Sequence, residues 1–406
     1  MKPASPEALG TRVGDSAPPS SLTAVRSLYV HIPFCERKCE YCDFTSVAGR
    51  RAEREYVAAL CGELRALAEA LPELELDTIF VGGGTPSFID PALLACVMSE
   101  VRESFRIAPD AEATLEANPS STSRERAAAW RAAGFNRVSL GVQSLDDECL
   151  RFLGRVHDSR RALDAVDDVR AAGFESINCD LIYAVPGLSD ELWRTSLDRV
   201  IGAHPGHVSC YELTVEPGTP LHASVSRGRV RTVAAEKALQ QHWLAVEALG
   251  TAGFRQYEVS NFATPRRECR HNLVYWRNGF YLAAGVGAHG HLPAAAAPSL
   301  GLEIDDDAVA VRYWHGRGVA AFVAAATASL LPIRGHESVT VSMRDQERIM
   351  LGLRLSEGVA IGDLRVGELV RDGLVALDGD RVHTTRRGQE LLGQVVLDIA
   401  ENSVAV

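Results

Sequence analysis

The chain of 406 residues lacks the features that mark several specialised classes of protein. It has no run of about 18 consecutive apolar residues, so we expect no membrane span. Its N-terminus has no basic start followed by an apolar stretch, so we expect no secretory signal. A positive charge balance is also missing: the net charge is −11, and an acidic surface repels the phosphate backbone of nucleic acids. These absences predict a cytoplasmic protein whose partners include neither a membrane nor nucleic acid.

The sequence also lacks the cysteine spacing of a disulfide framework. It has nine cysteines, and most of them are scattered. Five lie in largely apolar surroundings, where a thiol packs as a small hydrophobic group, and we expect these to be buried: Cys61, Cys96, Cys149, Cys179 and Cys210. Three others are clustered and need a different explanation.

The first part of the chain divides into a tail and a repeating pattern. Residues 1–26 are rich in Pro, Ser, Ala and Gly, which predicts a disordered tail. In residues 27–230, short β-like runs alternate with amphipathic helical stretches, the pattern of right-handed βαβ units around a parallel sheet. Six strands are expected, over 27–32, 78–82, 112–118, 137–142, 176–185 and 207–215. Six units are too few for a closed eight-stranded barrel, so we predict an α/β fold with an open (β/α)6 partial barrel and ligands at the carboxyl ends of its strands.

The rhythm changes after residue 230. Residues 231–340 are expected to form an extension of the core, with a helix over 234–250, a strand-like segment over 254–261 and then an irregular stretch to about residue 300. Residues 341–406 predict a separate winged-helix-like α+β domain, with a helix over 343–356, a segment over 361–372, a hairpin turn at Asp378-Gly379 and a last helix over 386–401.

A DNA-binding regulator is disfavoured by the charge of this last domain. Residues 344–406 hold eight Arg or Lys against eleven Asp or Glu, which is the wrong sign for binding phosphate.

The clustered cysteines are Cys35, Cys39 and Cys42, directly after the first strand. Their spacings allow three thiolates to surround one face of a small cluster. A [4Fe–4S] cube usually has four cysteine ligands, so three leave one iron with an open position, as in catalytic metal sites. That iron is able to chelate S-adenosylmethionine, and an electron from the cluster then cleaves a C–S bond of the sulfonium. The alternative is a structural zinc site with a distant fourth ligand such as Cys61, although zinc sites favour two close ligand pairs.

The segment YVHIPFCERKCEYCDF, residues 29–44, resembles the radical S-adenosylmethionine (radical SAM) superfamily. The resemblance is greatest to the branch that contains oxygen-independent coproporphyrinogen III dehydrogenase and its haem-chaperone relative, and it extends from about Leu28 to the C-terminus. It implies a [4Fe–4S] cluster, bound S-adenosylmethionine, and an electron donor such as a flavodoxin or ferredoxin.

The resemblance also implies a set of residues around S-adenosylmethionine. The glycines at residues 82–84 end the second strand and let the backbone approach a ligand closely, like a clasp for its amino group. Polar side chains recur after later strands, and a carboxylate inside an apolar strand is costly unless it is paired or ligand-bound. The implied contacts are Tyr29, Tyr41, Gly83, Gly84, Thr85, Glu116, Gln143, Arg155 and Asp180.

A second motif, HNLVYW at residues 271–276, resembles the HNxxYW signature that is associated with haem binding in the haem-chaperone branch. A neutral imidazole is a common axial ligand of haem iron, and Tyr and Trp offer flat apolar faces to a macrocycle. The implied haem contacts are His271, Asn272, Tyr275 and Trp276, with Cys269 and His289 as alternatives nearby. Without the resemblance, the pattern favours a structural histidine beside core aromatics.

One residue bears on the choice within the branch. The dehydrogenase has a further cysteine two residues after the third, where this chain has Phe44, and this puts dehydrogenase activity in doubt. We therefore predict a haem chaperone that binds haem and passes it to an unknown acceptor protein. The alternative is an oxygen-independent coproporphyrinogen III dehydrogenase, which performs an oxidative decarboxylation in porphyrin biosynthesis. Whether the chain is an enzyme stays open at this point.

Overall fold

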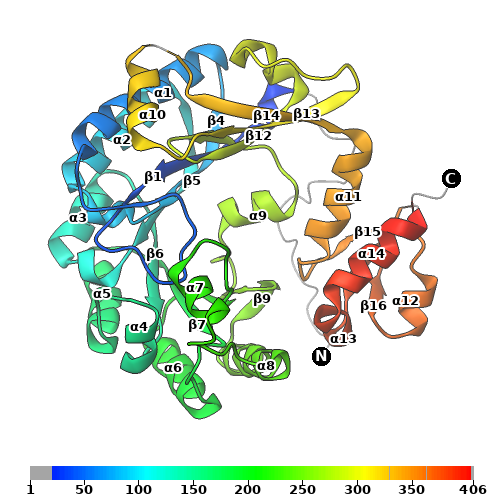
Figure 1. Cartoon of the computed structure of the whole chain (residues 1–406). Helices are drawn as coiled ribbons and strands as arrows, with labels where there is room; N and C mark the ends of the chain where they lie inside the picture. The colour runs from blue at the N-terminus through cyan, green and yellow to red at the C-terminus, as the bar shows by residue number, and fades with distance from the viewer. Residues whose placement is uncertain (1–20, 329, 363, 404–406) are drawn as a thin grey trace, which may run out of the picture.

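A nine-stranded sheet forms the centre of the computed structural model, which describes residues 21–328, 330–362 and 364–403 (Figure 1). The strand order is β11-β1-β4-β5-β6-β7-β8-β10-β9. The six strands in the middle are all parallel: β1 (Ser27–Ile32), β4 (Glu75–Gly83), β5 (Arg106–Ala117), β6 (Arg137–Gln143), β7 (Ser176–Tyr183) and β8 (His207–Glu212). The predicted open (β/α)6 fold, with its six strands, is confirmed.

Helices cover the outer, convex side of this sheet (Figure 1). They are α1 (Glu53–Ala70), α2 (Pro91–Ser104), α3 (Arg124–Ala132), α4 (Asp147–Phe152), α5 (Ser159–Ala171) and α6 (Asp190–Gly202). Side chains that precede five of these helices accept hydrogen bonds from their first N–H groups, which fixes where each helix begins: Asp90, Ser123, Asp146, Asp158 and Ser189.

The two faces of the sheet differ sharply in polarity. Side chains alternate between faces along a strand, and the outward-facing set is apolar, as Val138 and Leu140 of β6 show. The inward-facing set is polar and includes Arg137 and Ser139 of the same strand. Buried polar groups require partners, so a polar inner face indicates a site for ligands rather than a packing surface.

The scattered cysteines follow this division, with one exception. Cys179 and Cys210 lie on the outward face under the helices, and Cys61 and Cys149 are buried as well. The prediction was wrong for Cys96, which is exposed. It lies on the exposed side of α2, whereas Leu94, Val97, Met98 and Val101 form the buried side of this helix.

The extension is more ordered than the sequence predicted. Helix α7 (Pro220–Ser226) precedes it, and its own elements are α8 (Ala235–Thr251), β9 (Arg255–Glu258), β10 (Asn261–Ala263), α9 (Arg270–Trp276), β11 (Leu282–Ala284), β12 (His289–Pro293), β13 (Ala308–His315), α10 (Val319–Thr327) and β14 (Ile333–Thr340). Strand β11 joins the sheet beside β1, while β10 and β9 extend the other edge beside β8. Strands β12, β13 and β14 form a second, three-stranded sheet. The expected irregular stretch to about residue 300 was therefore wrong, because strands this short carry too little periodicity to be recognised.

The C-terminal part has its own hydrophobic core, from Ile349 to Ile399. It contains α11 (Val341–Gly352), β15 (Val359–Ala360), α12 (Gly367–Arg371), β16 (Val375–Asp378), β17 (Arg381–Thr384), α13 (Arg386–Glu390) and α14 (Leu392–Ser403). The strand order β15-β17-β16 with flanking helices is a winged-helix-like arrangement.

Three local expectations need correction or restriction. The hairpin turn is Gly379-Asp380, one residue later than predicted, because Asp378 pairs with Arg381 and Gly379 takes the left-handed conformation that this turn requires. The last helix is interrupted at Leu391.

Residues 1–20 of the expected tail lie outside the described residues. The remaining part of the tail includes a short 3₁₀ helix, η1 (Leu22–Ala24). None of the described helices is long and apolar enough to cross a membrane.

Tyr56 on α1 offers a test of how the extension is fastened to the core. Its buried hydroxyl donates to the carbonyl of His31 at 2.7 Å and accepts from the N–H of Val286 at 3.0 Å. Tyr56→Phe keeps the ring but leaves both backbone groups unpaired, so we expect a loss of about 1–3 kcal/mol in the free energy of unfolding, measured in urea.

Tyr183→Phe is the matched control, since Tyr183 is also a buried residue and its hydroxyl makes no hydrogen bond to the described residues. It should cost less than about 0.5 kcal/mol. Equal stabilities of the two variants would contradict the role given to Tyr56.

Candidate functional site

The three clustered cysteines lie on a loop at the carboxyl end of β1. The loop begins in β2 (Phe34–Cys35) and closes where that strand pairs in parallel with β3 (Val47–Ala48). Cys35 is buried, whereas Cys39 and Cys42 are partly exposed. All nine cysteines are free thiols. The loop therefore presents three reduced sulfur ligands at the edge of the sheet where the sequence predicted a ligand site.

The thiols influence one another electrostatically. Burial is the main cause that raises the pKa of Cys35 and brings that of Cys42 to about 11, and the neighbouring Cys39 raises both further. Three thiolates at this spacing repel one another, and iron ions between them would remove that cost. Among the described residues, no three His, Cys, Asp or Glu side chains are arranged around a single metal-ion position. A cube needs no such convergence, because its ligands bind different irons.

A chain of hydrogen bonds connects Cys35 with Cys39 through three other side chains. Thr85 Oγ1 donates to Cys35 Sγ at 3.5 Å, and Asn118 Nδ2 donates to Thr85 Oγ1 at 3.1 Å. Arg155 Nη2 donates to Asn118 Oδ1 at 2.5 Å, and its Nη1 donates to Cys39 Sγ at 3.2 Å. We call these five residues the cysteine-linking chain. Asn118 was missed by the sequence analysis, although it lies two residues after the predicted Glu116.

The glycine loop lies against the same cysteines. A Cβ atom on Gly84 would come within 2.7 Å of the Pro33 carbonyl carbon and 3.0 Å of Cys35 Sγ. A Cβ atom on Gly83, whose φ is +113°, would come within 2.5 Å of the His31 ring. Only glycine permits this close approach, which brings the loop that contains Gly83, Gly84 and Thr85 against the cysteine loop.

Two predicted carboxylates lie on the inner face of the sheet. Glu116 Oε2 accepts a hydrogen bond from the N–H of Gly83 at 2.9 Å, and burial raises the pKa of Glu116 to about 7. Burial likewise raises the pKa of Asp180, against hydrogen bonds from Asn178 Nδ2 at 2.7 Å and Ser139 Oγ at 3.1 Å. Asp180 is thus paired within the protein, whereas one oxygen of Glu116 accepts no hydrogen bond from the residues that the structure describes.

The remaining residues of the predicted S-adenosylmethionine set surround this region. Tyr29 stacks on Phe80, with ring centroids 6.2 Å apart. Burial raises the pKa of Tyr41, whose hydroxyl lies near Arg155. Gln143 ends β6 with a φ of +64°, a conformation that costs a non-glycine residue about 1 kcal/mol or more. Such strain at the end of a strand is typical of functional sites.

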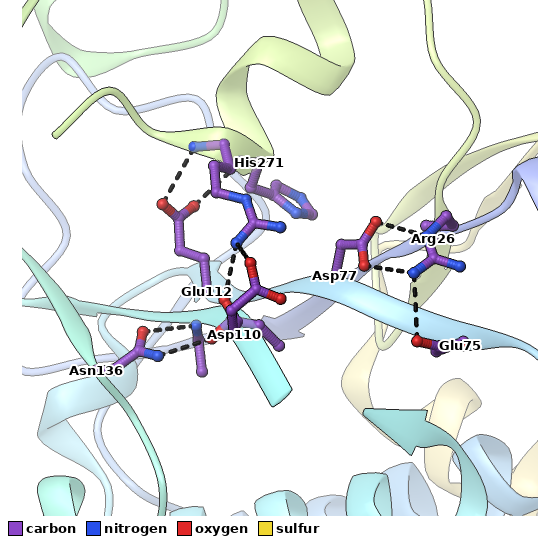
Figure 2. Close-up of polar contacts among 10 residues, drawn as sticks. Arg26, Glu75, Asp77, Asp110, Glu112, Asn136 and His271 are labelled. Atoms are coloured by element: carbon purple, nitrogen blue, oxygen red, sulfur yellow. Dashed lines mark hydrogen bonds and ion pairs between the residues drawn. The ribbon is translucent and has the colours of Figure 1, made fainter. Parts of the chain in front are cut away.

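The HNLVYW segment forms helix α9 on the concave side of the sheet, between the sheet and α11 (Figure 1). Figure 2 shows how the helix begins: the carboxylate of Glu112 accepts hydrogen bonds from the backbone N–H groups of Arg270 and His271, each at 3.1 Å. Glu112 also accepts from the thiol of Cys269 at 3.5 Å. The start of α9 is therefore fixed to the inner face of β5.

His271 is enclosed, with both ring nitrogens hydrogen-bonded. Nδ1 contacts Thr78 Oγ1 at 2.8 Å, and Nε2 contacts the hydroxyl of Tyr275 at 2.8 Å. Because the Thr78 hydroxyl itself donates to Ser27, the imidazole N–H is on Nδ1, and Nε2 accepts from Tyr275. Burial lowers the pKa of His271 to about 3, so the ring is neutral. Ligation of iron by this histidine requires the Tyr275 hydroxyl to move away from Nε2.

The other residues of the motif face different parts of the protein. Asn272 Nδ2 donates to the hydroxyl of Tyr257 at 3.3 Å. The indole of Trp276 is partly exposed, with Arg354 of the C-terminal part 5.9 Å from the ring centroid, and its Nε1 has no hydrogen-bond partner. The alternative ligand His289 is exposed and stacks on Trp314. The motif thus connects the inner face of the sheet with the C-terminal part.

Comparison with known proteins identifies the superfamily to which the chain belongs. The model of the radical SAM superfamily matches residues 29–200. The solved structure of the radical SAM enzyme coproporphyrinogen III oxidase (HemN) from Escherichia coli superposes with a TM-score of 0.77, covering 96% of this chain and 92% of that one, at 21% identity. The likeness shows the fold, and the chain belongs to the radical SAM superfamily.

Curated relatives define the family within that class. The haem chaperone HemW of Mycobacterium tuberculosis (strain H37Rv) is 38% identical over 379 residues, which cover 91% of this chain and 93% of the relative. HemW of Bacillus subtilis is 31% identical over 83% of this chain and 85% of its own length. HemW of Escherichia coli is 40% identical over 65% and 69%. The chain belongs to the HemW family.

The raised pKa of Glu116 predicts a pH-dependent stability. The folded chain holds this proton up to about pH 7, whereas the ordinary pKa is 4.5, so the free energy of unfolding falls as the pH rises between these values. Because the side chain is partly exposed, we expect a fall of about 1–2 kcal/mol. Urea unfolding between pH 4.5 and 7.5 measures it.

Glu116→Gln stays neutral and should show a smaller fall than the wild type. Glu247→Gln, on the exposed surface of α8, should follow the wild type. A wild-type slope retained in Glu116→Gln would show that another group is responsible.

Proposed function

We propose that this protein is a haem chaperone that binds haem and transfers it to an acceptor protein. The observation that carries the proposal is the nearly full-length similarity to curated proteins of that name, together with the HNxxYW motif on the inner face of the sheet. Nine free thiols fit the reducing cytoplasm, where we propose that it acts.

We further propose that Cys35, Cys39 and Cys42 hold a [4Fe–4S] cluster, with S-adenosylmethionine on the open iron. The cluster, once reduced by a flavodoxin or ferredoxin, supplies the electron for reductive cleavage of the sulfonium. Arg155 and Thr85 direct N–H and O–H groups at two of the sulfurs, which orients the thiolates and stabilises their charge. We propose that the other predicted contacts complete the S-adenosylmethionine site: Tyr29, Tyr41, Gly83, Gly84, Glu116, Gln143 and Asp180.

For haem, we propose that His271 provides the axial ligand after the hydroxyl of Tyr275 has moved aside. The neutral imidazole is the protonation state that metal binding needs. Tyr275 and Trp276 then offer aromatic faces to the macrocycle, and Asn272 a polar group to its edge. In the described conformation the Tyr275 hydroxyl occupies Nε2 of His271, so haem binding would require this side chain to turn.

The dehydrogenase alternative has less support. Phe44 replaces its additional cysteine and is 63% exposed, so it supplies no ligand. Similarity to the solved coproporphyrinogen oxidase is a likeness of fold at 21% identity, whereas the haem-chaperone relatives are 31–40% identical.

The cluster assignment predicts the metal content of cysteine variants. After anaerobic reconstitution with iron and sulfide, the wild type should contain about four irons per chain, as a cube requires. Cys39→Ala should lose most of this iron because a cube with two protein ligands is poorly held. Cys210→Ala, a buried thiol under the helices, is the control and should keep it. Zinc in place of iron, or full iron content in Cys39→Ala, would refute the assignment.

The haem assignment predicts opposite effects of two neighbouring substitutions. His271→Ala removes the ligand and should weaken haem binding at least tenfold in absorption titrations. Tyr275→Phe removes the hydroxyl that occupies Nε2 and should strengthen binding. Tyr281→Phe, on the ring that packs edge-on against Tyr275 at 4.6 Å, is the control and should change little. Unchanged binding in His271→Ala would exclude this histidine as the ligand.

A further inference from the structure

Arg137, the first residue of β6, is a buried cation without a partner. Its side chain is on the inner face, like that of Ser139 two residues later, and the residue is only 2% exposed. The guanidinium makes no hydrogen bond or ion pair with the residues that the structure describes, and its Nε is fully enclosed. A guanidinium has five N–H donors, and leaving a buried charge unpaired costs several kcal/mol. Such a group calls for an acceptor from outside the chain.

Carboxylates near Arg137 are already engaged elsewhere. Glu112 accepts from two backbone N–H groups at the start of α9 and from the thiol of Cys269. Figure 2 shows the Glu112 carboxylate directed at that helix rather than into the space beside it. Asp180 accepts from Asn178 and Ser139. These acids favour a positive charge nearby, since both raise the pKa of Arg137, but they do not contact it.

The surroundings of Arg137 belong to the HNLVYW helix. Arg137 pairs with Thr114 of β5, two residues after Glu112, which holds the start of α9. Burial is the main cause that lowers the pKa of His271 and of His207, and the charge of Arg137 lowers both further. Cys269, which donates to Glu112, and Tyr257, which contacts His207, belong to the same region. An anion bound here would lie beside α9, in the position of a group attached to a ligand that His271 holds.

S-adenosylmethionine is not the source of that anion. Its carboxylate would be at the iron cluster, beyond the carboxyl ends of the strands. Arg137 lies at the opposite end of β6, and the six residues up to Gln143 span about 20 Å. Haem has two propionate carboxylates, and the planar guanidinium matches a carboxylate with two parallel hydrogen bonds.

We propose that Arg137 is a haem-binding residue that pairs with a propionate carboxylate while α9 holds the iron. The proposal rests on the proposed haem binding and adds a contact outside the HNxxYW motif. The pairing would give this buried cation the carboxylate partner that the described residues do not supply.

The experiment compares haem with its dimethyl ester, in which both propionates are uncharged. Both ligands are titrated, in one solvent mixture, into reconstituted wild type, Arg137→Gln and Arg102→Gln. Wild type should bind haem about 10–100-fold more tightly than the ester, the range expected for one charge-assisted pair. Arg137→Gln should lose most of this preference by weakening haem binding alone. Arg102→Gln removes a guanidinium that bonds the Ala133 carbonyl outside the inner face, and should keep the preference.

Each outcome has a distinct meaning. Equal binding of haem and ester by wild type overturns the proposal, and so does an Arg137→Gln variant that keeps the wild-type preference or loses affinity for both ligands alike. Absence of haem binding in wild type instead refutes the proposed function. If Arg137→Gln does not fold, as judged by iron content and melting temperature, Arg137→Lys takes its place. Lysine keeps the charge without the two parallel donors and should give an intermediate preference, while a full wild-type preference would count against the proposed geometry.

Discussion

The arrangement of the site depends on the cysteine-linking chain, in which hydrogen bonds run from Cys35 through Thr85, Asn118 and Arg155 to Cys39. Two cysteines on one loop are thereby connected to Thr85 after β4 and to Asn118 after β5. Arg155, which follows α4, also donates to the carbonyl of Gly141 in β6 at 3.1 Å. The only strand pair of the loop itself is the short one between β2 and β3, so these side-chain bonds add to its attachment to the sheet.

A second connection leads from this site to the HNLVYW helix. Tyr29 stacks on Phe80, Phe80 stacks on His271 at 5.3 Å, and His271 meets Tyr275 edge-on at 5.1 Å. The same strands therefore support the region proposed for S-adenosylmethionine and the motif proposed for haem.

Much of the fold was predictable, since the six core strands show clear alternation and helices separate them. The spacing of the three cysteines indicated a shared ligand site, and the structure has all three as free thiols on one loop after β1. The hydrogen bonding of both ring nitrogens of His271 was not predictable. Its partner Thr78 is 193 residues away in the sequence, and the motif by itself does not show what surrounds the ring. Asn118 was missed because an asparagine before a proline reads as a turn residue. The lack of a hydrogen-bond partner for Arg137 among the described residues could not be predicted, because it depends on the positions of all the side chains around it.

The central claim is that the loop holds a cluster with one iron open to S-adenosylmethionine. Electron paramagnetic resonance of the reduced, reconstituted protein, recorded with and without S-adenosylmethionine, tests it most directly. We expect the signal of a reduced [4Fe–4S] cluster whose g values shift when S-adenosylmethionine is added, because the ligand binds the open iron. A cluster signal that is unchanged by S-adenosylmethionine would contradict the account.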